Sequence, residues 1–595
     1  MNKRQVIYYI KTIISAIGIS MLLKLPVVSI YPLFLWMICM HLYRQEAIGN
    51  KRRYVYTWIG AFLFSGMLSL GMLQDLMEHG WKVAIIQMFF IFSGSVLFLQ
   101  WALTQIFILL DNTDKKKLEA QERKIPVRRV FGVSYVVMVV LWIPVWLAHA
   151  PALMNSDTID QIQQALGMRP VSNHHPAVHT LLMRGIYRIT CFLGIHDIEV
   201  SFGIMGVLQL LLMAAVCAGA ATYVYYWKRN KCLFVLMIMF YGMVAYNAYY
   251  SITLWKDTLH AGITVVFLIL LHAYFSTTNR KGKLLVAIFC SGLLFSLFRS
   301  NGVYALLLWG ALLLAVILKN VWIKKSVGVK KEVTLLLTIG GILAMSLIIK
   351  GSVYSAMEID EPVITEKLSI PLQQVACVVA NNRELSAYET EMINRIAWID
   401  GIRENYVDYI SDPIKSWVAM CGRRDYLKTY KWEYLRLWIS LGMKYPKDYL
   451  FAWINQTKGY WYPNTSYWVY FGTLMENDLG LTETPIISWD FTHWLDKWVE
   501  RYKEIPLYGS LWNLGVYSWG MILLELYALY KKKWGDALLV ALPICLWGTL
   551  LISTPVYAEF RYLYAVILSM PLLVGLLYGR DCKTSEGEEL EHGTI

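Results

Sequence analysis

Apolar stretches of about 17 to 25 residues recur along the whole chain, and each is long enough to cross the hydrocarbon core of a bilayer as an α-helix. A helix can do so because its backbone groups pair within the segment. Over 595 residues the sequence is 57% hydrophobic and only 16% charged, which excludes a soluble domain of this size. We therefore predict an all-α polytopic membrane protein with about 14 transmembrane helices. The candidate spans are residues 5–23, 26–43, 54–73, 83–110, 130–149, 199–227, 232–251, 258–275, 284–299, 302–318, 333–350, 511–530, 536–552 and 561–578.

The basic residues lie in alternate loops between these spans. A formal net charge of +13 would otherwise suggest a nucleic-acid partner, but short basic loops are typical of the cytoplasmic side of a membrane protein. We therefore expect no nucleic acid, a multi-pass protein of the cell (plasma) membrane, and both termini in the cytoplasm. The basic loops are residues 44–53, 115–129, 228–231, 280–283, 324–331 and 531–533.

The same pattern divides the chain into five parts. The interval 351–510 is too long and too polar for a loop, and its helical periodicity favours a folded domain. The parts are an N-terminal four-helix membrane region with a basic cytoplasmic loop (1–129), a membrane core (130–350) with the first external loop (150–198), a mainly helical extracytoplasmic domain (351–510), C-terminal membrane helices (511–578) and a cytoplasmic tail (579–595).

The longest polar interval in the first half of the chain, residues 155–180, lies on the predicted external side. Asn155 or Ser156 is a suitable helix N-cap, which places Asp157 in the first turn. A carboxylate on such a helix can deprotonate or orient an acceptor hydroxyl. The alternative is an acid that only complements the helix dipole. Helical spacing puts four polar side chains on one face, expected to look into a cavity: Asp157, Asp160, Gln161 and Gln164.

Three histidines follow in the same interval. His174 and His175 precede Pro176, which is expected in the first turn of a helix, so free backbone N–H groups there can face an anion. His175 and His179 lie four residues apart, a spacing that can chelate a metal, but no third ligand is evident in this loop. The histidines are therefore candidates for donors to an anion, for a structural helix start or for a metal site.

Two more motifs are expected at external ends of spans. Lys256 and Asp257 adjoin an apolar run, where charges are costly unless they face a cavity. The alternative is a snorkelling lysine with its counter-ion. Arg299 lies in a very tight connection and is a candidate bidentate phosphate ligand. Asn301 in the same connection is needed for the turn itself, and it is also a candidate substrate-orienting residue.

Glu559 and Arg561 lie at the external start of the last span. They either form a local ion pair or face the same cavity as the earlier cations. Convergence of Lys256, Arg299 and Arg561 on one cavity would suit a lipid-linked phosphate, because phosphate charge is expensive near lipid.

An aromatic segment lies within the predicted external domain. Its rings can stack on sugar faces or anchor the chain at a membrane interface, and anchoring is the favoured interpretation. The residues are Trp461, Tyr462, Trp468 and Tyr470.

Together these motifs resemble a known class of membrane enzymes. The segments NSDTIDQ, NHHPAVHT, LWKD, FRSNG, SIPLQQ, GYWYP and AEFRY are similar to those of DUF6020, a bacterial membrane family, and their arrangement resembles the GT-C superfamily of membrane glycosyltransferases. The resemblance covers roughly residues 130–578 and leaves the first four spans outside. Many relatives carry a Lys- or His-Pro-Pro element in the first loop, whereas this chain has the single Pro176, which leaves the roles of the histidines open.

The resemblance implies a GT-C-like core and an inverting transfer of a sugar from a polyprenyl-phosphate donor to a cell-envelope glycan, lipid or protein. It implies catalysis by Asp157, with Asp160 as the second candidate. No cofactor is certain, and a divalent metal stays open. The donor-phosphate ligands would be Lys256, Arg299 and Arg561, and the substrate-orienting residues His174, His175, His179, Asp257, Asn301 and Glu559.

Other classes fit the same sequence. A flippase or transporter of lipid-linked saccharides would be expected to have related halves and charges midway through its spans, whereas the charges here lie at the external ends. A polysaccharide polymerase or ligase would differ in the number of sugars transferred per event. A scaffold without activity is disfavoured by the convergent cations and the polar loop.

Overall fold

The structure is a computed structural model that describes residues 3–44, 50–115, 125–277, 282–324, 329–421, 424–465, 467–470 and 472–579. Within these residues it consists of helices joined by turns, with isolated β-bridges and no strand. The predicted all-α class is therefore confirmed for this part of the chain. The expected cytoplasmic tail lies, from residue 580 onward, outside the described residues.

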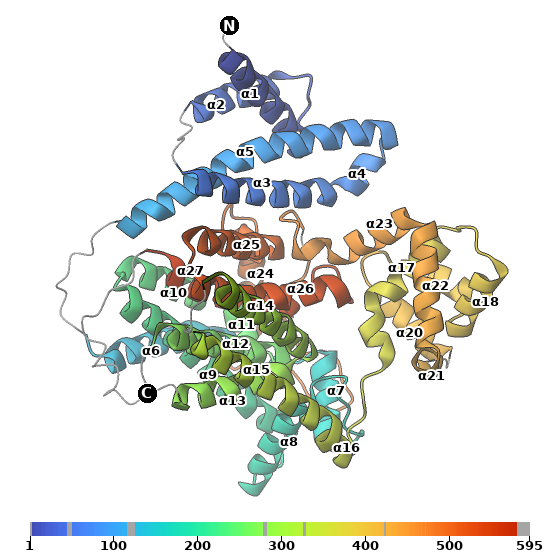
Figure 1. Cartoon of the computed structure of the whole chain (residues 1–595). Coiled ribbons are helices and arrows are strands. Elements are labelled where there is room, and N and C mark those ends of the chain that lie inside the picture. Colours follow the sequence, from blue (N-terminus) through green and yellow to red (C-terminus); the bar gives the residue numbers. More distant parts are fainter. Residues whose placement is uncertain are drawn as a thin grey trace.

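Most expected spans coincide with helices of the structure (Figure 1). Among the described residues, ten helices are long and apolar enough to cross a membrane. A further candidate is the pair α10 (Lys231–Met243) and α11 (Ala245–Ile252), which is bent by 55°. The ten are α1 (Lys3–Leu22), α3 (Lys51–Gly71), α5 (Trp81–Lys115), α6 (Val127–Ala148), α9 (Ile198–Lys228), α12 (Lys256–Ser276), α14 (Ser300–Lys324), α15 (Lys330–Ile348, continued by a π-helical turn and α16, Tyr354–Ala356), α26 (Trp534–Ser553) and α27 (Phe560–Leu577).

By length and composition, the described residues hold ten or eleven candidate spans, so the predicted number of about fourteen is not confirmed. α2 (Ile30–Tyr43) and α13 (Gly282–Phe298) are apolar but have only 14 and 17 residues. At a rise of about 1.5 Å per residue, α2 is shorter than a hydrocarbon core of about 30 Å. α25 (Leu514–Lys531) contains Glu525 and ends on Lys531, and it is not among the candidate spans.

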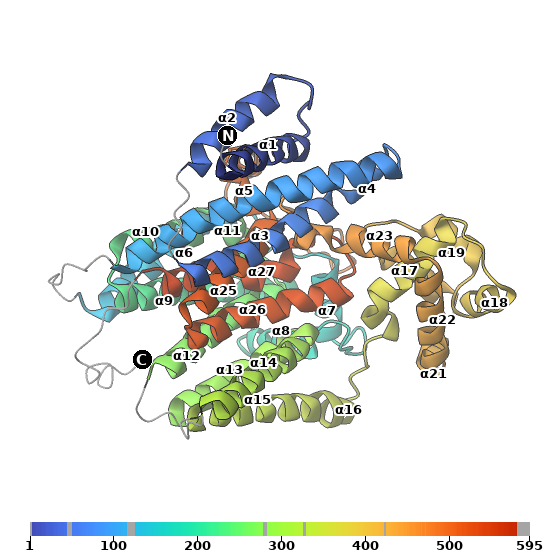
Figure 2. The ribbon, with the colours of Figure 1, turned by 45° about the horizontal axis from the view of Figure 1, so that its top comes forward.

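The other helices connect or cap these spans. Figures 1 and 2 show α1, α3 and α5 along one edge of the molecule, with α3 beside α25, and α17 to α23 as a body that projects from one end. The remaining helices are α4 (Leu73–Met77), α7 (Ser156–Ala165), α8 (Ala177–Phe192), α17 (Ser369–Ala380), α18 (Ala387–Ile396), α19 (Ile399–Asn405), α20 (Asp412–Met420), α21 (Arg424–Thr429), α22 (Lys431–Lys444), α23 (Pro446–Thr457) and α24 (Trp489–Tyr502).

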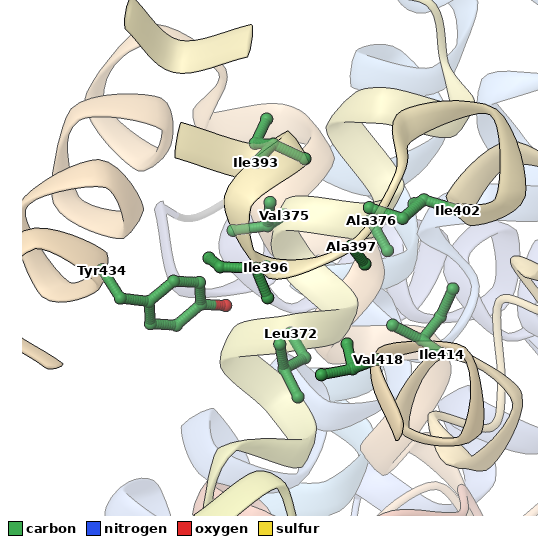
Figure 3. Close-up of a pocket in the computed structure, with 10 residues that line it drawn as sticks. All are labelled: Leu372, Val375, Ala376, Ile393, Ile396, Ala397, Ile402, Ile414, Val418 and Tyr434. Atoms are coloured by element: carbon green, nitrogen blue, oxygen red, sulfur yellow. The ribbon is translucent and has the colours of Figure 1, made fainter. Parts of the chain in front are cut away.

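The projecting body has its own hydrophobic core, to which α17, α18, α20 and α22 contribute Val378, Ile393, Ile414 and Leu437. Figure 3 shows a cavity inside this core, lined almost entirely by aliphatic side chains together with Tyr434. Its volume is about 20 Å³, which is room for one water molecule. A space of this size and lining offers no ligand site, so the chemistry must be sought elsewhere.

Two of the four rings in the aromatic segment that follows this body are buried rather than placed at an interface as expected. Trp461 and Tyr462 are only 3% and 7% exposed and belong to the main core of the protein. The Trp461 ring stacks on Trp453 with 6.0 Å between ring centres, and its indole N–H donates to Thr457 at 3.1 Å. The interface prediction was wrong for these two rings because the chain turns back into the membrane core, where each ring finds a packing partner.

The neighbouring Tyr460 positions the loop that leads into α27. Its hydroxyl donates to the carbonyl of Val556 at 3.0 Å and accepts the backbone N–H of Glu559 at 3.1 Å. Gly459 lies directly under this loop, because a Cβ built there would lie 2.3 Å from both the Cβ of Ala558 and the carbonyl oxygen of Tyr557. The start of α27 therefore depends on a close backbone approach at Gly459.

We expect Gly459→Ala to lower stability by about 1–3 kcal/mol, because the added methyl group must displace backbone atoms that cannot move independently. The thermal transition of the detergent-solubilised protein measures this effect. Gly185→Ala in α8 is the matched control, since a Cβ there meets nothing within 4 Å. Equal transition temperatures for the two variants would contradict the close approach.

Candidate functional site

Asp157 lies in the first turn of α7, a helix of 10 residues. Asn155, one of the two predicted caps, starts this helix by accepting the backbone N–H of Thr158 at 3.1 Å. The backbone N–H of the preceding Leu153 donates to Ile252, the last residue of α11, at 3.2 Å, and its carbonyl accepts from Leu254, in the connection to α12, at 3.0 Å. This pairing holds the first loop against the start of α12, where Lys256 is the first residue.

The predicted polar face of α7 is only partly correct. Gln161 and Gln164 are buried instead of facing a cavity. Gln161 contacts Nδ1 of His179 at 3.0 Å, and Gln164 donates to Asp160 at 2.7 Å. Buried amides require such partners, and helical spacing alone could not place them. The two carboxylates remain partly accessible, with 23% of the Asp157 side chain and 29% of the Asp160 side chain exposed.

Three nitrogen-bearing side chains converge on the carboxylate of Asp157. Arg561 donates to Oδ2 at 2.6 Å, and the Lys256 ammonium donates to the same oxygen at 3.4 Å. Nδ1 of His175 lies 3.9 Å from this oxygen and 2.8 Å from the Lys256 ammonium. The four residues come from α7, α12, α27 and the turn before α8, so the cluster joins four segments that are distant in sequence.

The charges of this cluster set the protonation of its members. Burial disfavours the charged form of Asp157, but Arg561 and Lys256 outweigh it and hold the pKa of this carboxyl well below its usual value. Burial and the adjacent Lys256 hold the pKa of His175 well below its usual value. At pH 7 a carboxylate therefore faces two cations, and a neutral imidazole accepts a hydrogen bond from Lys256.

Arg299 belongs to the same cluster but has a different acid as its partner. One of its guanidinium nitrogens lies 2.6 Å from Oδ1 of Asp257, whose side chain is 1% exposed. The guanidinium groups of Arg299 and Arg561 lie 4.8 and 5.3 Å from the centre of the Tyr562 ring, which links the two cations. Because an unpaired buried carboxylate is costly, the first role of Arg299 is to neutralise Asp257.

Glu559 is the buried N-cap residue of α27, and its Oε1 lies 2.8 Å from Nε of Arg561. Burial raises the pKa of Glu559 to about 7, although Arg561 opposes this shift. The Arg561 guanidinium also lies 5.2 Å from the centre of the Trp255 ring. Arg561 is thus held by two carboxyl groups and by aromatic rings, which fixes its direction toward Asp157.

The two other histidines are not part of the charged cluster. The ring of the exposed His174 lies 4.5 Å from the ring of His175, measured between their centres, and its backbone N–H donates to Ser172 at 3.1 Å. His179 is fully buried in α8, and burial lowers its pKa to about 3, so its ring is neutral. Pro176 is the N-cap residue of α8, close to the predicted place in the first turn.

Asp160 and Asn301 lie at the edge of the site or outside it. Asp160 accepts from Arg169 at 3.0 Å, and its Oδ2 lies 3.9 Å from Nε2 of His175. Asn301 donates to Thr549 at 3.1 Å, which ties α14 to α26. Of the two predicted catalytic acids, Asp157 is therefore the one that contacts Arg561 and Lys256.

The alternative of a metal site at His175 and His179 does not fit the geometry. Over the ranges that the structure describes, no group of three or more His, Cys, Asp or Glu side chains is placed to hold a metal ion. The Asp157 carboxylate is engaged by two cations, and Nδ1 of His179 is engaged by Gln161. These residues lead to no step that proceeds through a metal.

A second charged group, centred on His149, was missed from the sequence. His149 follows α6 and is completely buried between Glu483, at 2.8 Å, and Asp496, at 3.2 Å. The hydroxyl of Tyr249 in α11 donates to Asp496 at 2.5 Å. These residues tie α24 and the segment before it to the loop that leads to Asp157. No local pattern could have revealed them, because His149 and Glu483 are 334 positions apart.

Comparison with known proteins gives a family but no activity. A family model described as "Family of unknown function (DUF6020)" matches residues 167–589, which is more than two thirds of the chain. The chain belongs to this family. The matched range begins after α7, so it contains Lys256, Arg299 and Arg561 but not Asp157. No curated protein and no solved structure matches the chain.

The His149 group predicts a pH dependence of stability. Burial opposes protonation, but the contacts with Asp496 and Glu483 raise the pKa of His149 to about 9 from the ordinary value of 6.5. The stabilisation is then complete below about pH 6.5 and is lost as the pH rises through about 9. It amounts to about 3 kcal/mol.

The thermal transition of the solubilised protein at pH 6 and at pH 9.5 measures this contribution. The wild-type protein should lose more stability between the two pH values than His149→Gln, in which the titrating group is absent. Equal losses in both proteins would contradict a protonated His149.

Proposed function

We propose that this DUF6020 protein is an integral membrane glycosyltransferase of the GT-C type. It would move a sugar from a polyprenyl-phosphate donor to a cell-envelope acceptor on the extracytoplasmic face, with inversion at the anomeric carbon. The observation that carries the proposal is the meeting of the Asp157 carboxylate with Arg561 and Lys256, at 2.6 and 3.4 Å, at the ends of two apolar helices. An acid beside two cations is the combination that such a transfer needs.

The two cations and the carboxylate have different roles in this reaction. The acceptor hydroxyl oxygen attacks the anomeric carbon while the bond from that carbon to the phosphate oxygen breaks, and the electron pair of that bond leaves with polyprenyl phosphate. Lys256 and Arg561 stabilise the charge on this leaving phosphate. Asp157 orients the acceptor hydroxyl and takes its proton. Attack from the side opposite the phosphate inverts the configuration.

The ion pairs of the resting protein suggest how donor binding prepares the base. With Arg561 and Lys256 on its carboxylate, Asp157 is a weak base because its pKa is low. A donor phosphate that draws these cations toward itself would weaken their hold on the carboxylate. The pKa of Asp157 would then rise toward the range in which a carboxylate accepts a proton efficiently. Donor binding would thus activate the residue that receives the acceptor.

The position of the charges favours transfer over transport. Lys256 is the first residue of α12, Arg561 is the second residue of α27, and Asp157 lies on the separate helix α7. Charges that carry a substrate through a membrane are expected near the middle of spans. The same placement is compatible with a polymerase, which would repeat the transfer on one acceptor chain.

Asp157→Asn should reduce sugar transfer by about 10²–10⁴-fold, because the amide cannot accept the hydroxyl proton. Asp160→Asn is the matched control, since Asp160 bonds to Arg169 and Gln164 outside the cation pair. It should retain most of the activity. The assay is the release of free polyprenyl phosphate by the purified protein, with the thermal transition as the check on folding. Near-normal turnover by Asp157→Asn would refute the assignment of the catalytic acid.

Arg299→Gln should destabilise the protein by about 3–5 kcal/mol, because it leaves the Asp257 carboxylate buried and unpaired. The double variant Arg299→Gln/Asp257→Asn should recover part of this loss, since it removes the buried charge as well. Thermal transitions of the two variants measure the difference. If the double variant is no more stable than Arg299→Gln, Arg299 stabilises the protein through another contact, such as the one with the Tyr562 ring.

A further inference from the structure

Helix α24 has three distinct faces. Thr492, Leu495 and Val499 are buried against the rest of the protein. A second face carries the rings of Phe491, Trp494, Trp498 and Tyr502, at helical spacings of three and four residues, and Trp494 and Trp498 remain 56% and 43% exposed. The third face is polar and carries His493, Lys497, Glu500 and Arg501. An exposed aromatic face between a buried face and a polar face is typical of a helix at a membrane surface.

Phe491, at the start of the aromatic face, packs against the core, whereas the exposed rings farther along the helix contact one another. Trp494 and Trp498 stack with 6.0 Å between their ring centres, and the Trp498 and Tyr502 ring centres are 3.9 Å apart. The turn that follows adds Leu507, which is 88% exposed and has a positive φ of 69°. A bulky residue with a positive φ has a strained backbone. In water, its exposed apolar side chain would make no contact that offsets this strain.

Hydrogen bonds place the start of α24 at the end of a membrane span. The backbone N–H of Ile486 donates to the carbonyl of Leu147 at 2.9 Å, and the hydroxyl of Thr492 donates to the carbonyl of Ala148 at 2.9 Å. Ala148 is the last residue of α6, whose exposed apolar side chains reach Ile143, one turn earlier. The aromatic face of α24 therefore begins where the lipid-facing surface of α6 ends.

We propose that α24 is a membrane-surface helix, and that its aromatic face and Leu507 contact lipid of the leaflet on the side of the candidate site. Tryptophan and tyrosine favour the boundary between hydrocarbon and head groups. The acidic and basic residues of the helix are nearly balanced: Asp490, Asp496 and Glu500 against Lys497 and Arg501. The contact is accordingly apolar and interfacial, and it requires no anionic lipid.

This lipid contact is linked to the candidate site through the buried residue His149. Asp496, on the same helix, lies 3.2 Å from Nε2 of His149 and accepts from Tyr249 at 2.5 Å. His149 starts the loop that leads to Asp157, and Tyr249 lies in the helix before Lys256. A helix held at the membrane surface would thus fix the depth of Asp157 and Lys256 relative to the lipid head groups.

Photocrosslinking of the wild-type chain tests the contact without any substitution. The purified protein is reconstituted in phosphatidylcholine vesicles that contain a phospholipid with a photoactivatable group near its head group, and the labelled residues are identified by mass spectrometry. Label is expected on Trp494, Trp498 and Leu507 and several-fold less on Lys497 and Glu500. Addition of an anionic lipid should leave this pattern unchanged.

Three outcomes would overturn the proposal. They are equal labelling of both faces of α24, absence of label from α24 while the exposed residues of α6 are labelled, and labelling that requires anionic lipid. The second outcome would mean that the aromatic face does not reach the lipid.

A matched pair of variants gives a second measurement. Trp498→Asp places a charge on the aromatic face and should lower the yield of protein reconstituted in vesicles several-fold, whereas Lys497→Asp should not. Both variants should fold in detergent, as judged by their thermal transitions. Equal yields of the two variants in vesicles would also contradict the proposal.

Discussion

The ion pair between Asp157 and Arg561 is the contact on which the candidate site depends. It joins residues 404 positions apart at 2.6 Å, and it brings the first polar loop to the start of the last membrane helix. Two charges in a partly buried place are stable only when each has a partner. Lys256 shares Asp157, Glu559 lies beside Arg561, and Arg299 pairs with Asp257. Asp157 and Arg561 thus each have a second partner, whereas removal of Arg299 would take from the buried Asp257 the cation that lies 2.6 Å away.

Backbone contacts explain why these charges can meet. The loop before α27 is held by the Tyr460 hydroxyl over Gly459, and the loop before α7 is held by the backbone of Leu153. The charged side chains of the candidate site therefore extend from helix starts that are fixed by hydrogen bonds, not from long free loops. A site built in this way is preorganised, which is what electrostatic stabilisation of a leaving group requires.

Much of the fold could be predicted from the sequence because membrane helices and helix caps are local features. Apolar length predicted most spans, and the cap at Asn155 placed Asp157 correctly in its helix. Charges on the predicted external side also identified Lys256 and Arg561, since a charged residue at the end of a span needs a polar partner. The predicted number of about fourteen spans is not confirmed, because among the described residues α2 and α13 are apolar but have fewer than 18 residues.

The rest depended on contacts between distant segments. Gln161 appeared to belong to a cavity face, but its partner His179 comes from the next helix. The burial of His149 between Glu483 and Asp496 could not be predicted either, because these residues come from distant segments. Trp461 was expected at a membrane interface and is buried instead, whereas the exposed aromatic face lies on α24. Helical spacing reveals that a face exists, but it does not reveal what covers that face.

The most direct test of the central claim is a transfer assay with the purified wild-type protein in vesicles. A panel of polyprenyl-phosphate sugars is offered with cell-envelope acceptors, and the product and the released polyprenyl phosphate are quantified together. The account predicts that at least one polyprenyl-phosphate sugar is consumed with equal amounts of both products, and that the new glycosidic bond has the inverted configuration. Movement of the intact lipid-linked sugar across the vesicle membrane, without release of polyprenyl phosphate, would contradict it.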